Sequence, residues 1–329
     1  MRARAALRHS PLPDPQVTTR FQHVFGPVPS RRLGRSLGID LVPFKTCTYD
    51  CLYCQLGRTR HKTVELSEYV PADRVLVEIE VALASGAHPD WITLSGSGEP
   101  TLHARMGDVI AAVRRLTDVP VAVLTNGSLL WDDRVQRGLA DADLVIPSLD
   151  AADDRMFRRV NRPHEALSLD LVLDGLTAFR RAFAGAIWLE VFLLRGISDT
   201  ERHVEELAEV AHRLAPDRIQ LNTVARPPAD AAARPVPRET LERLATRFEP
   251  TAQVIADRHE ASAADLPCAA EEMLLGLLAR RPCSLEDVSR ALGLVVPEAL
   301  KRLDSLVHDG RVTVVSQGKQ PFYTRAPED

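Results

Sequence analysis

The sequence predicts an α/β fold: a partial (β/α)6 barrel followed by a small C-terminal winged helix-turn-helix domain. Short apolar runs alternate with amphipathic helical patterns from about residue 25 to about residue 258, which is typical of parallel β/α units. A Pro-rich stretch at residues 226–237 interrupts this alternation before its last helix and strand. The last 60 residues or so show helical patterns followed by two short strand patterns around a turn, and therefore predict a separate unit.

The composition is that of a globular protein. The chain has 329 residues, of which 45% are hydrophobic and 26% charged, and this length favours about two domains. Aromatic residues make up only 5%, which argues against a stacking surface for single-stranded nucleic acid. We expect no membrane span, because the sequence has no apolar run of about 20 residues. We expect no secretory signal either, because the N-terminus lacks an apolar core.

The barrel elements are predicted from the helical and strand periodicities of the apolar residues. Residues 1–22 are rich in Arg, Pro and Ala without a period and are interpreted as a flexible tail. The predicted strands are Ser36–Val42, Trp91–Ser95, Val121–Thr125, Leu144–Ser148, Trp188–Leu194 and Arg218–Asn222. The predicted helices between them are Ala72–Leu83, Met106–Leu116, Asp132–Leu139, Leu169–Phe183 and Glu201–Leu214. Six strands with their helices make a partial barrel, in which functional residues lie at the carboxyl ends of the strands.

The segments after the sixth strand set the expected domain boundaries. Residues 226–237 are Pro-rich and predict an extended loop, after which the helix Arg238–Phe248 and the short strand Gln253–Ala256 close the barrel. The first domain is therefore expected at 23–258, a linker at 259–268 and the second domain at 269–329.

The second domain is expected to contain three helices and a hairpin. The expected helices are Ala269–Arg280, one capped by Ser284 with Asp287 three residues on, and Pro297–His308. Strands Val312–Val315 and Phe322–Thr324 flank a Gly-containing turn. This order matches a winged helix. Between residues 269 and 325 eight basic residues face seven acidic ones, so the charge that would favour nucleic-acid binding is weak, and docking of a protein or peptide is an alternative role.

Three of the five cysteines lie within eight residues, as Cys47-x3-Cys51-x2-Cys54. Thiolates at this spacing can converge on one metal centre from a single loop. A structural zinc site would need a fourth ligand, for which His61 is a candidate. An electron-transfer cluster would need distant Cys268 or Cys283 as the fourth ligand. In the third interpretation no fourth protein ligand is needed. Three thiolates hold a 4Fe–4S cluster and leave one iron open, as in a catalytic metal site.

The motif, with Tyr53 just before the last cysteine, resembles that of the radical S-adenosyl-L-methionine (SAM) superfamily. The resemblance implies that Cys47, Cys51 and Cys54 bind a 4Fe–4S cluster and that the amino and carboxylate groups of SAM chelate the open iron. It further implies that one electron from the cluster cleaves SAM to a 5′-deoxyadenosyl radical, which takes a hydrogen atom from a substrate. An external one-electron donor such as flavodoxin or ferredoxin is implied by the same chemistry.

The loops after the predicted strands supply candidate SAM ligands. The second strand is followed by SGSGEP, which resembles the loop that binds the methionyl ammonium of SAM in the superfamily, and the role is carried to Ser97, Gly98 and Glu99. Asn126 follows the third strand, in TNGS, where a turn or helix cap is the alternative interpretation. The other candidates, for the ribose, the carboxylate or the adenine, are Tyr53, Ser148, Asp150 and Asn222, and Asp150 is also placed to cap a helix.

Basic charge gathers around the cysteines. Residues 1–62 carry a net charge of +8, whereas the remainder carries −12. Arg31, Arg32, Arg35 and Lys45 therefore form either an anion-binding rim for SAM or a substrate phosphate, or an ordinary solvated basic face.

Within the superfamily the chain is similar to the group related to the wyosine synthases, which modify a tRNA guanine. The similarity is carried by FGPVPSRRLGRSLGIDLVPFKTCTYDCLYC, SGSGEPTL, SLDA with NRPH, and LNT with RPP. No cysteine precedes Cys47, so the second cluster of those enzymes is not carried over, and a relative with a different substrate is expected. The sequence thus favours a radical SAM enzyme that modifies RNA, with a tRNA-like substrate. The alternatives are a peptide or small-molecule substrate docked by the winged helix, and an iron–sulfur transcription regulator.

Overall fold

A computed structural model describes residues 21–255, 271–292, 294, 296–318 and 320–326. The predicted linker 259–268, with Cys268, and all but the last two residues of the predicted tail lie outside the described residues. Among the helices that the structure describes, none is both long and apolar enough to cross a membrane. The domain boundaries at 23–258 and 269–329 remain predictions.

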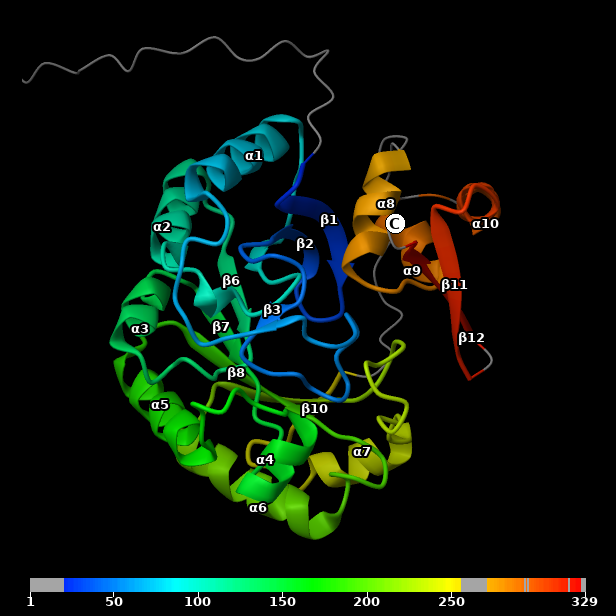
Figure 1. The fold of residues 1–329 in the computed structure, drawn as a ribbon. Coiled ribbons are helices and arrows are strands. Elements are labelled where there is room, and N and C mark those ends of the chain that lie inside the picture. Colours follow the sequence, from blue (N-terminus) through cyan, green and yellow to red (C-terminus); the bar gives the residue numbers. More distant parts are fainter. Residues whose placement is uncertain (1–20, 256–270, 293, 295, 319, 327–329) are drawn as a thin grey trace, which may run out of the picture.

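An eight-stranded sheet forms the centre of the larger unit (Figure 1). Its strand order is β1-β2-β5-β6-β7-β8-β9-β10. The bounds are β1 Val24–Ser30, β2 Gly34–Ile39, β5 Trp91–Leu94, β6 Val121–Thr125, β7 Leu144–Pro147, β8 Ala186–Phe192, β9 Arg218–Asn222 and β10 Gln253–Val254. Every neighbouring pair is parallel except the antiparallel β1–β2 hairpin. The carboxyl ends of β2 and β5–β9 therefore meet along one edge of the sheet.

Helices cover the outer side of this sheet, as Figure 1 shows. They are α1 Ala72–Ala84, α2 Met106–Leu116, α3 Asp133–Leu139, α4 Asp154–Val160, α5 Leu169–Ala182, α6 Glu201–Leu214 and α7 Arg238–Ala245. Side chains of Asp132, Asp153, Ser168 and Thr200 accept hydrogen bonds from the first turns of α3 to α6 and so fix where these helices begin. Buried Val, Leu and Ile side chains from both layers form one continuous core between the helices and the sheet.

The structure confirms an α/β fold with a mostly parallel central sheet, and it adds elements that the sequence did not predict, among them β1 and α4. Strand β1 contains Pro27, Pro29 and Gly26, and prolines argue against a strand because they cannot donate to a sheet ladder. They are tolerated here because β1 lies at the edge of the sheet. Helix α4, which has seven residues, was not predicted either.

Two small features lie near the carboxyl ends of the strands. Strands β3 (Thr46–Cys47) and β4 (His61–Lys62) pair in parallel and close the loop that carries the cysteines. The short 3-10 helix η1 (Pro100–Leu102) follows β5, and its cap is the side chain of Glu99.

The C-terminal unit consists of three helices and a hairpin with its own core. The elements are α8 Glu271–Arg280, α9 Leu285–Ala291, α10 Val296–His308, β11 Val312–Gln317 and β12 Gln320–Arg325. The expected capping box is present, because Ser284 and Asp287 each accept from the other's backbone N–H. The unit packs beside β1: Val28 joins its core, and the Arg280 guanidinium lies 4.4 Å from the centre of the Phe25 ring. Figure 1 shows this unit alongside β1.

Candidate active site

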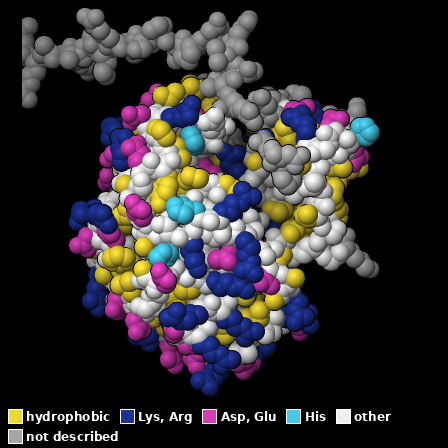
Figure 2. Space-filling view, viewed as in Figure 1, with side chains coloured by type: hydrophobic (Ala, Val, Ile, Leu, Met, Phe, Trp, Pro, Cys, Tyr) yellow, Lys and Arg dark blue, Asp and Glu magenta, His cyan; other side chains and the backbone are white. Residues whose placement is uncertain are grey.

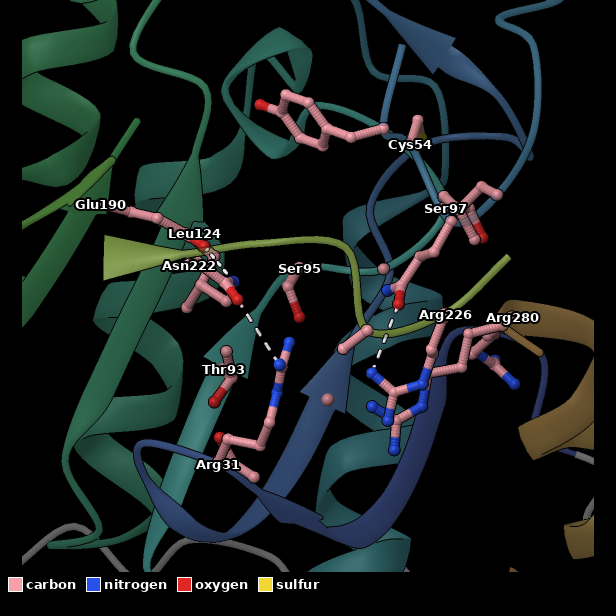
Figure 3. A pocket seen from close by; sticks show the side chains of 18 of the residues that line it. Arg31, Cys54, Thr93, Ser95, Ser97, Leu124, Glu190, Asn222, Arg226 and Arg280 are labelled. Carbon is pink, nitrogen blue, oxygen red and sulfur yellow. Dashed lines mark hydrogen bonds between the residues drawn. The ribbon is translucent and has the colours of Figure 1, made fainter. Parts of the chain in front are cut away.

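A cavity of about 690 Å³ lies inside the partial barrel, at the carboxyl ends of its strands. Its wall comes from the β1–β2 hairpin, the cysteine loop and the ends of β5 to β9, and the C-terminal unit completes it with Leu277, Arg280, Arg281 and Phe322. The volume is in the range of cavities that hold one or two small ligands. Figure 3 shows the interior, with Cys54 at one end and Arg31 at the other.

The three cysteines of the predicted motif all line this cavity. Each sulfur atom is within reach of a different side-chain N–H group: Lys45 Nζ lies 3.2 Å from Cys54 Sγ, Asn126 Nδ2 lies 3.5 Å from Cys47 Sγ, and Asn161 Nδ2 lies 3.6 Å from Cys51 Sγ. Donors of this kind stabilise thiolates and tune the potential of an iron–sulfur cluster.

Burial opposes ionisation of these thiols in the protein alone. It raises the pKa of Cys47 to about 12 and the pKa of Cys51 well above its ordinary value, with the Glu99 and Asp150 carboxyl groups adding to the respective shifts. A bound metal centre supplies the positive charge that makes such thiols ionise. The donor set therefore fits a cluster held by three cysteines of one loop.

Lys45 is a functional candidate that the sequence interpretation placed only in a general basic rim. Its side chain is 3% exposed, its backbone adopts a φ of 66°, and its backbone N–H donates to the Ser97 carbonyl. The backbone is thus held in the left-handed region that few non-glycine residues adopt. The hydrogen bond to Ser97, together with the contact to Cys54, holds the cysteine loop against the loop after β5.

The loop after β5 passes close to the cysteine loop at Gly98. A Cβ atom on Gly98 would lie 1.8 Å from the Thr46 carbonyl oxygen, so no side chain fits there. Gly96 adopts a φ of 128° beside the carboxylate of Asp40. Ser97 is bound through both its hydroxyl and its backbone N–H to that same carboxylate. The loop is therefore shaped by glycines and anchored by Asp40, which the sequence analysis did not single out.

We expect Gly98→Ala to destabilise the protein and to lower its capacity to bind the cluster. The added methyl group must displace the backbone at Thr46, next to Cys47, and overpacking of this kind costs about 1–3 kcal/mol. Thermal unfolding and iron content after reconstitution measure both effects. The matched control is Gly138→Ala in α3, where the nearest atoms are 3.6 Å or more from the new Cβ, and no loss of stability is expected. Equal behaviour of the two variants would contradict the proposed close approach.

Glu99 lies at the junction of three strand ends and is 2% exposed. Its carboxylate accepts from Thr101, from the Thr125 hydroxyl at 2.6 Å and from the Asn126 backbone N–H at 2.7 Å. Burial raises its pKa although these hydrogen bonds oppose the rise. Asn126, from the end of β6, donates in turn to Thr48 Oγ1 at 2.7 Å and to Cys47. Glu99 therefore positions Asn126 against the cysteine loop.

Tyr53 and Asp150 form a buried pair beside the cavity. The Tyr53 hydroxyl donates to Asp150, and its ring stacks on Phe192 with centres 3.8 Å apart. Asp150 also accepts from Asn161 at 2.7 Å and from the Phe192 backbone at 3.0 Å. With these donors its oxygen atoms are already engaged, and Asp150 is not part of the cavity wall. Its place in the structure is that of a residue that positions Tyr53 and Asn161.

The stability of the protein should fall as the pH rises through the titration of Asp150. Burial raises the pKa of this carboxyl to about 6, so the folded state binds its proton more tightly than the unfolded chain does. Its contribution to stability is thus greatest below the unfolded pKa and is lost as the pH rises to about 6. Denaturant unfolding of the wild type and of Asp150→Asn, measured from pH 4 to pH 7, tests this. The difference between the two proteins should change across that range, and a constant difference would contradict the assignment.

At the far side of the barrel, Asn222 connects the ends of β8 and β9 to the β1–β2 turn. Its amide donates to Glu190 Oε1 at 2.7 Å and its oxygen lies 3.4 Å from Arg31 Nη1. Glu190 forms an ion pair with Arg32 at 2.8 Å. The pKa of Glu190 is lowered because Arg32 and the Asn222 hydrogen bond outweigh the effect of burial. Glu190 gave no signal in the sequence beyond being one polar residue in an apolar strand.

Most predicted site residues come together at the cavity. Its wall includes the three cysteines, Tyr53, Ser97, Gly98, Glu99, Asn126, Ser148 and Asn222. Of the four residues in the predicted basic rim, Arg31, Arg32 and Lys45 line the cavity, whereas Arg35 is directed to Asp90 outside it. Asn161, Asp40 and Glu190 were missed as contributors to the site because their partners come from distant parts of the chain.

Comparison with known proteins agrees with this geometry. The family model of the radical SAM superfamily matches residues 41–211, which include the cysteine motif and the strands β5 to β8. The chain therefore belongs to the radical SAM superfamily. It is an enzyme of a superfamily that uses a 4Fe–4S cluster and SAM.

Two curated relatives extend the similarity over most of the chain. A UPF0026 protein of Helicobacter pylori strain J99 is 33% identical over 304 residues, which cover 91% of this chain and 96% of the relative. A protein of Brachyspira hyodysenteriae named GTPase Obg is 35% identical over 299 residues, covering 89% of this chain. The chain spans only 44% of the length of that second relative.

The fold also resembles a solved structure described as native anSMEcpe with bound AdoMet. The TM-score is 0.50, the identity is 15%, and the match covers 67% of this chain and 63% of the other. At this identity the similarity extends to the fold alone.

Proposed function

We propose that this protein is a radical SAM enzyme that modifies a nucleotide of RNA, with Cys47, Cys51 and Cys54 as the ligands of its cluster. When bound, the cluster and SAM supply a 5′-deoxyadenosyl radical that removes a hydrogen atom from the substrate. The observation that carries the proposal is the cysteine triad in the cavity wall, with a separate N–H donor at each sulfur.

The chain's own residues would hold the reactants in place. Lys45, Asn126 and Asn161 orient and stabilise the three thiolates. Gly98 and Glu99 bring the loop after β5 against the cysteine loop, where its backbone groups would bind the methionyl part of SAM, and the Glu99 carboxylate holds Asn126 in place. Tyr53, Ser148 and Asn222 line the cavity further along the strand ends, where they would contact the rest of SAM or the substrate. Asp150 acts on this set through Tyr53 and Asn161.

The charge of the cavity supports a nucleic-acid substrate. Seven basic residues line it, against three acidic ones: Arg31, Arg32, Lys45, Arg226, Arg280, Arg281 and Arg290, against Glu99, Glu190 and Asp287. Figure 2 shows further Lys and Arg side chains on the face of the larger unit near its boundary with the C-terminal unit. Excess positive charge of this kind favours phosphate groups. A cavity of about 690 Å³ would admit one nucleotide turned out of its strand.

The remaining parts of the proposal concern partners and location. The three helices and hairpin at residues 271–326 have the element order of a winged helix, and we assign them to substrate docking. A flavodoxin or ferredoxin would supply the electron. We place the enzyme in the cytoplasm, because an oxygen-sensitive cluster held by free thiols requires a reducing compartment.

Deuterium transfer tests the substrate assignment. The reconstituted enzyme would be incubated without oxygen with SAM, dithionite and tRNA isolated from cells grown in deuterated medium. Mass spectrometry of 5′-deoxyadenosine then reports whether a deuterium atom came from the RNA. We expect transfer with deuterated tRNA and none with deuterated peptides. Transfer from peptides alone would replace the RNA proposal with a peptide substrate while leaving the radical chemistry in place.

A further inference from the structure

Arg31 enters the cavity without a carboxylate partner. It comes from the turn between β1 and β2, and its side chain lines the cavity at the end opposite Cys54 (Figure 3). Its Nη1 atom donates to the neutral amide oxygen of Asn222 at 3.4 Å. Within the described part of the chain, no carboxylate oxygen lies within 4.0 Å of its guanidinium. The Arg31 side chain is largely buried, and buried arginine side chains are usually paired with an acidic side chain.

Two further arginines reach the same part of the cavity from other segments. Arg226 comes from the loop after β9, and its side chain is only 10% exposed. Its Nε atom is buried without a hydrogen-bond partner. Arg281 follows α8 and belongs to the C-terminal unit. Each of these two cations is close enough to Arg31 to oppose its charge.

The acidic residues of the cavity wall are already engaged elsewhere. Glu190 pairs with Arg32 at 2.8 Å, and Glu99 is bound by Thr125 and Asn126. Asp287 lies 3.4 Å from Arg226 and 3.6 Å from Arg290, and it also caps α9. One carboxylate thus serves two arginines. Glu190 and Asp287 lie near enough to attract Arg31 and Arg281 respectively, but within the described residues neither of these two arginines forms an ion pair with a carboxylate.

This arrangement costs free energy unless an anion is present. Burial and the neighbouring Arg226 and Arg32 lower the pKa of Arg31 to about 10, and the attraction of Glu190 offsets only part of this effect. Arginine nevertheless stays protonated at neutral pH, so the repulsion persists. A bound anion would remove it, and guanidinium groups bind the oxygens of phosphate in a fork-like geometry.

We propose that Arg31, Arg226 and Arg281 form a subsite for a phosphate group of the substrate, shared between the barrel and the C-terminal unit. This inference rests on the proposed function and names the group by which the substrate is held. In Figure 3, the guanidinium groups of Arg31 and Arg226 lie away from Cys54, and Arg226 reaches back toward the cysteine loop through Gln55 Oε1 at 3.4 Å. The C-terminal unit is then part of the binding site and not merely a neighbour of it.

Phosphate binding can be measured without any turnover. We would titrate the SAM-loaded, reconstituted enzyme with inorganic phosphate, uridine 5′-monophosphate and the dinucleotide UpU, using isothermal titration calorimetry with uridine as the uncharged reference. Arg31→Gln and Arg281→Gln should each weaken phosphate binding at least tenfold, and Arg31→Lys should lose less than Arg31→Gln. The matched control is Arg115→Gln on the exposed face of α2, for which no change is expected.

The comparison of probes identifies the source of the phosphate. Tighter binding of the monophosphate assigns a free phosphomonoester, whereas tighter binding of UpU assigns the phosphodiester of an RNA chain, and both support the subsite. Equal affinity for uridine and its monophosphate, or unchanged phosphate binding in folded Arg31→Gln and Arg281→Gln, would overturn it. A parallel loss of SAM affinity in Arg31→Gln would also overturn it, because Arg31 would then serve SAM. Failure of the wild type to cleave SAM would count against the proposed function alone.

Discussion

Simultaneous replacement of Cys47, Cys51 and Cys54 by alanine is expected to abolish cluster binding. The loop would lose all three thiolates, and no other cysteine among the described residues lies in the cavity wall. Iron and sulfide content should fall from about four of each per chain to near zero, with loss of the cluster's visible absorbance and of its signal in electron paramagnetic resonance. The single variant Cys51→Ala should give the same result, because two remaining thiolates cannot hold the cluster against loss of iron.

The matched control is Cys283→Ala. Cys283 is the fourth described cysteine, but it is buried in the core of the C-terminal unit and its backbone pairs with Tyr323. We expect this variant to keep its cluster and to lose some stability from the small cavity it creates. If Cys283→Ala lost the cluster to the same extent as the triple variant, or if the triple variant retained it, the assignment of the ligands would be wrong.

The second large effect is expected at the ion pair between Glu190 and Arg32. The two side chains are 14% and 11% exposed, and their charged atoms lie 2.8 Å apart. Glu190→Gln keeps the shape but leaves Arg32, with Arg31 nearby, without a compensating charge. Removing one partner of a buried pair is strongly destabilising, and we expect a loss of about 3 kcal/mol in the free energy of unfolding. Denaturant unfolding measures this loss.

The pH dependence provides a second measurement on the same pair. The pKa of Glu190 is lower in the folded state, so the ionised carboxylate stabilises the protein at neutral pH. That stabilisation is lost as the pH falls through the lowered pKa, and the gap between wild type and Glu190→Gln should narrow accordingly. The control is Glu206→Gln, which removes an exposed pair with Arg202 at 2.9 Å and should cost no more than about 0.5 kcal/mol. A similar cost in both variants would contradict the buried character of the first pair.

Much of the barrel could be predicted because its signals are local. The bounds expected for Met106–Leu116, Val121–Thr125, Glu201–Leu214 and Arg218–Asn222 are those of the structure. Each of these elements is long or apolar enough to show a helical or strand periodicity in the sequence. The side chain of Thr200 caps the helix Glu201–Leu214 and marks where it begins. The β1–β2 hairpin could not be predicted in the same way. The prolines of β1 argue against a strand, and only its pairing with β2 in the folded chain shows that it is an edge strand.

The same distinction between local and distant signals applies to the candidate site. The cysteines and the loop at Gly98 are visible as a motif and a glycine pattern within a few residues of sequence. The contacts that support the cysteines and this loop are not visible in the sequence, because Asn161 lies 110 residues from Cys51 and Asp40 lies 57 residues from Ser97. The same applies to Arg31, which reads as one of several arginines in the sequence. Only the folded chain shows that Glu190 pairs with Arg32, while Arg31 faces the cavity and hydrogen-bonds to Asn222.

The most direct test of the central claim is the formation of 5′-deoxyadenosine. The enzyme would be reconstituted with iron and sulfide without oxygen, supplied with SAM and dithionite, and analysed by mass spectrometry beside the triple cysteine variant. We predict 5′-deoxyadenosine from the wild type and none from the variant. A wild-type protein with a full cluster that neither cleaves SAM nor changes its cluster spectrum when SAM is added would contradict the account.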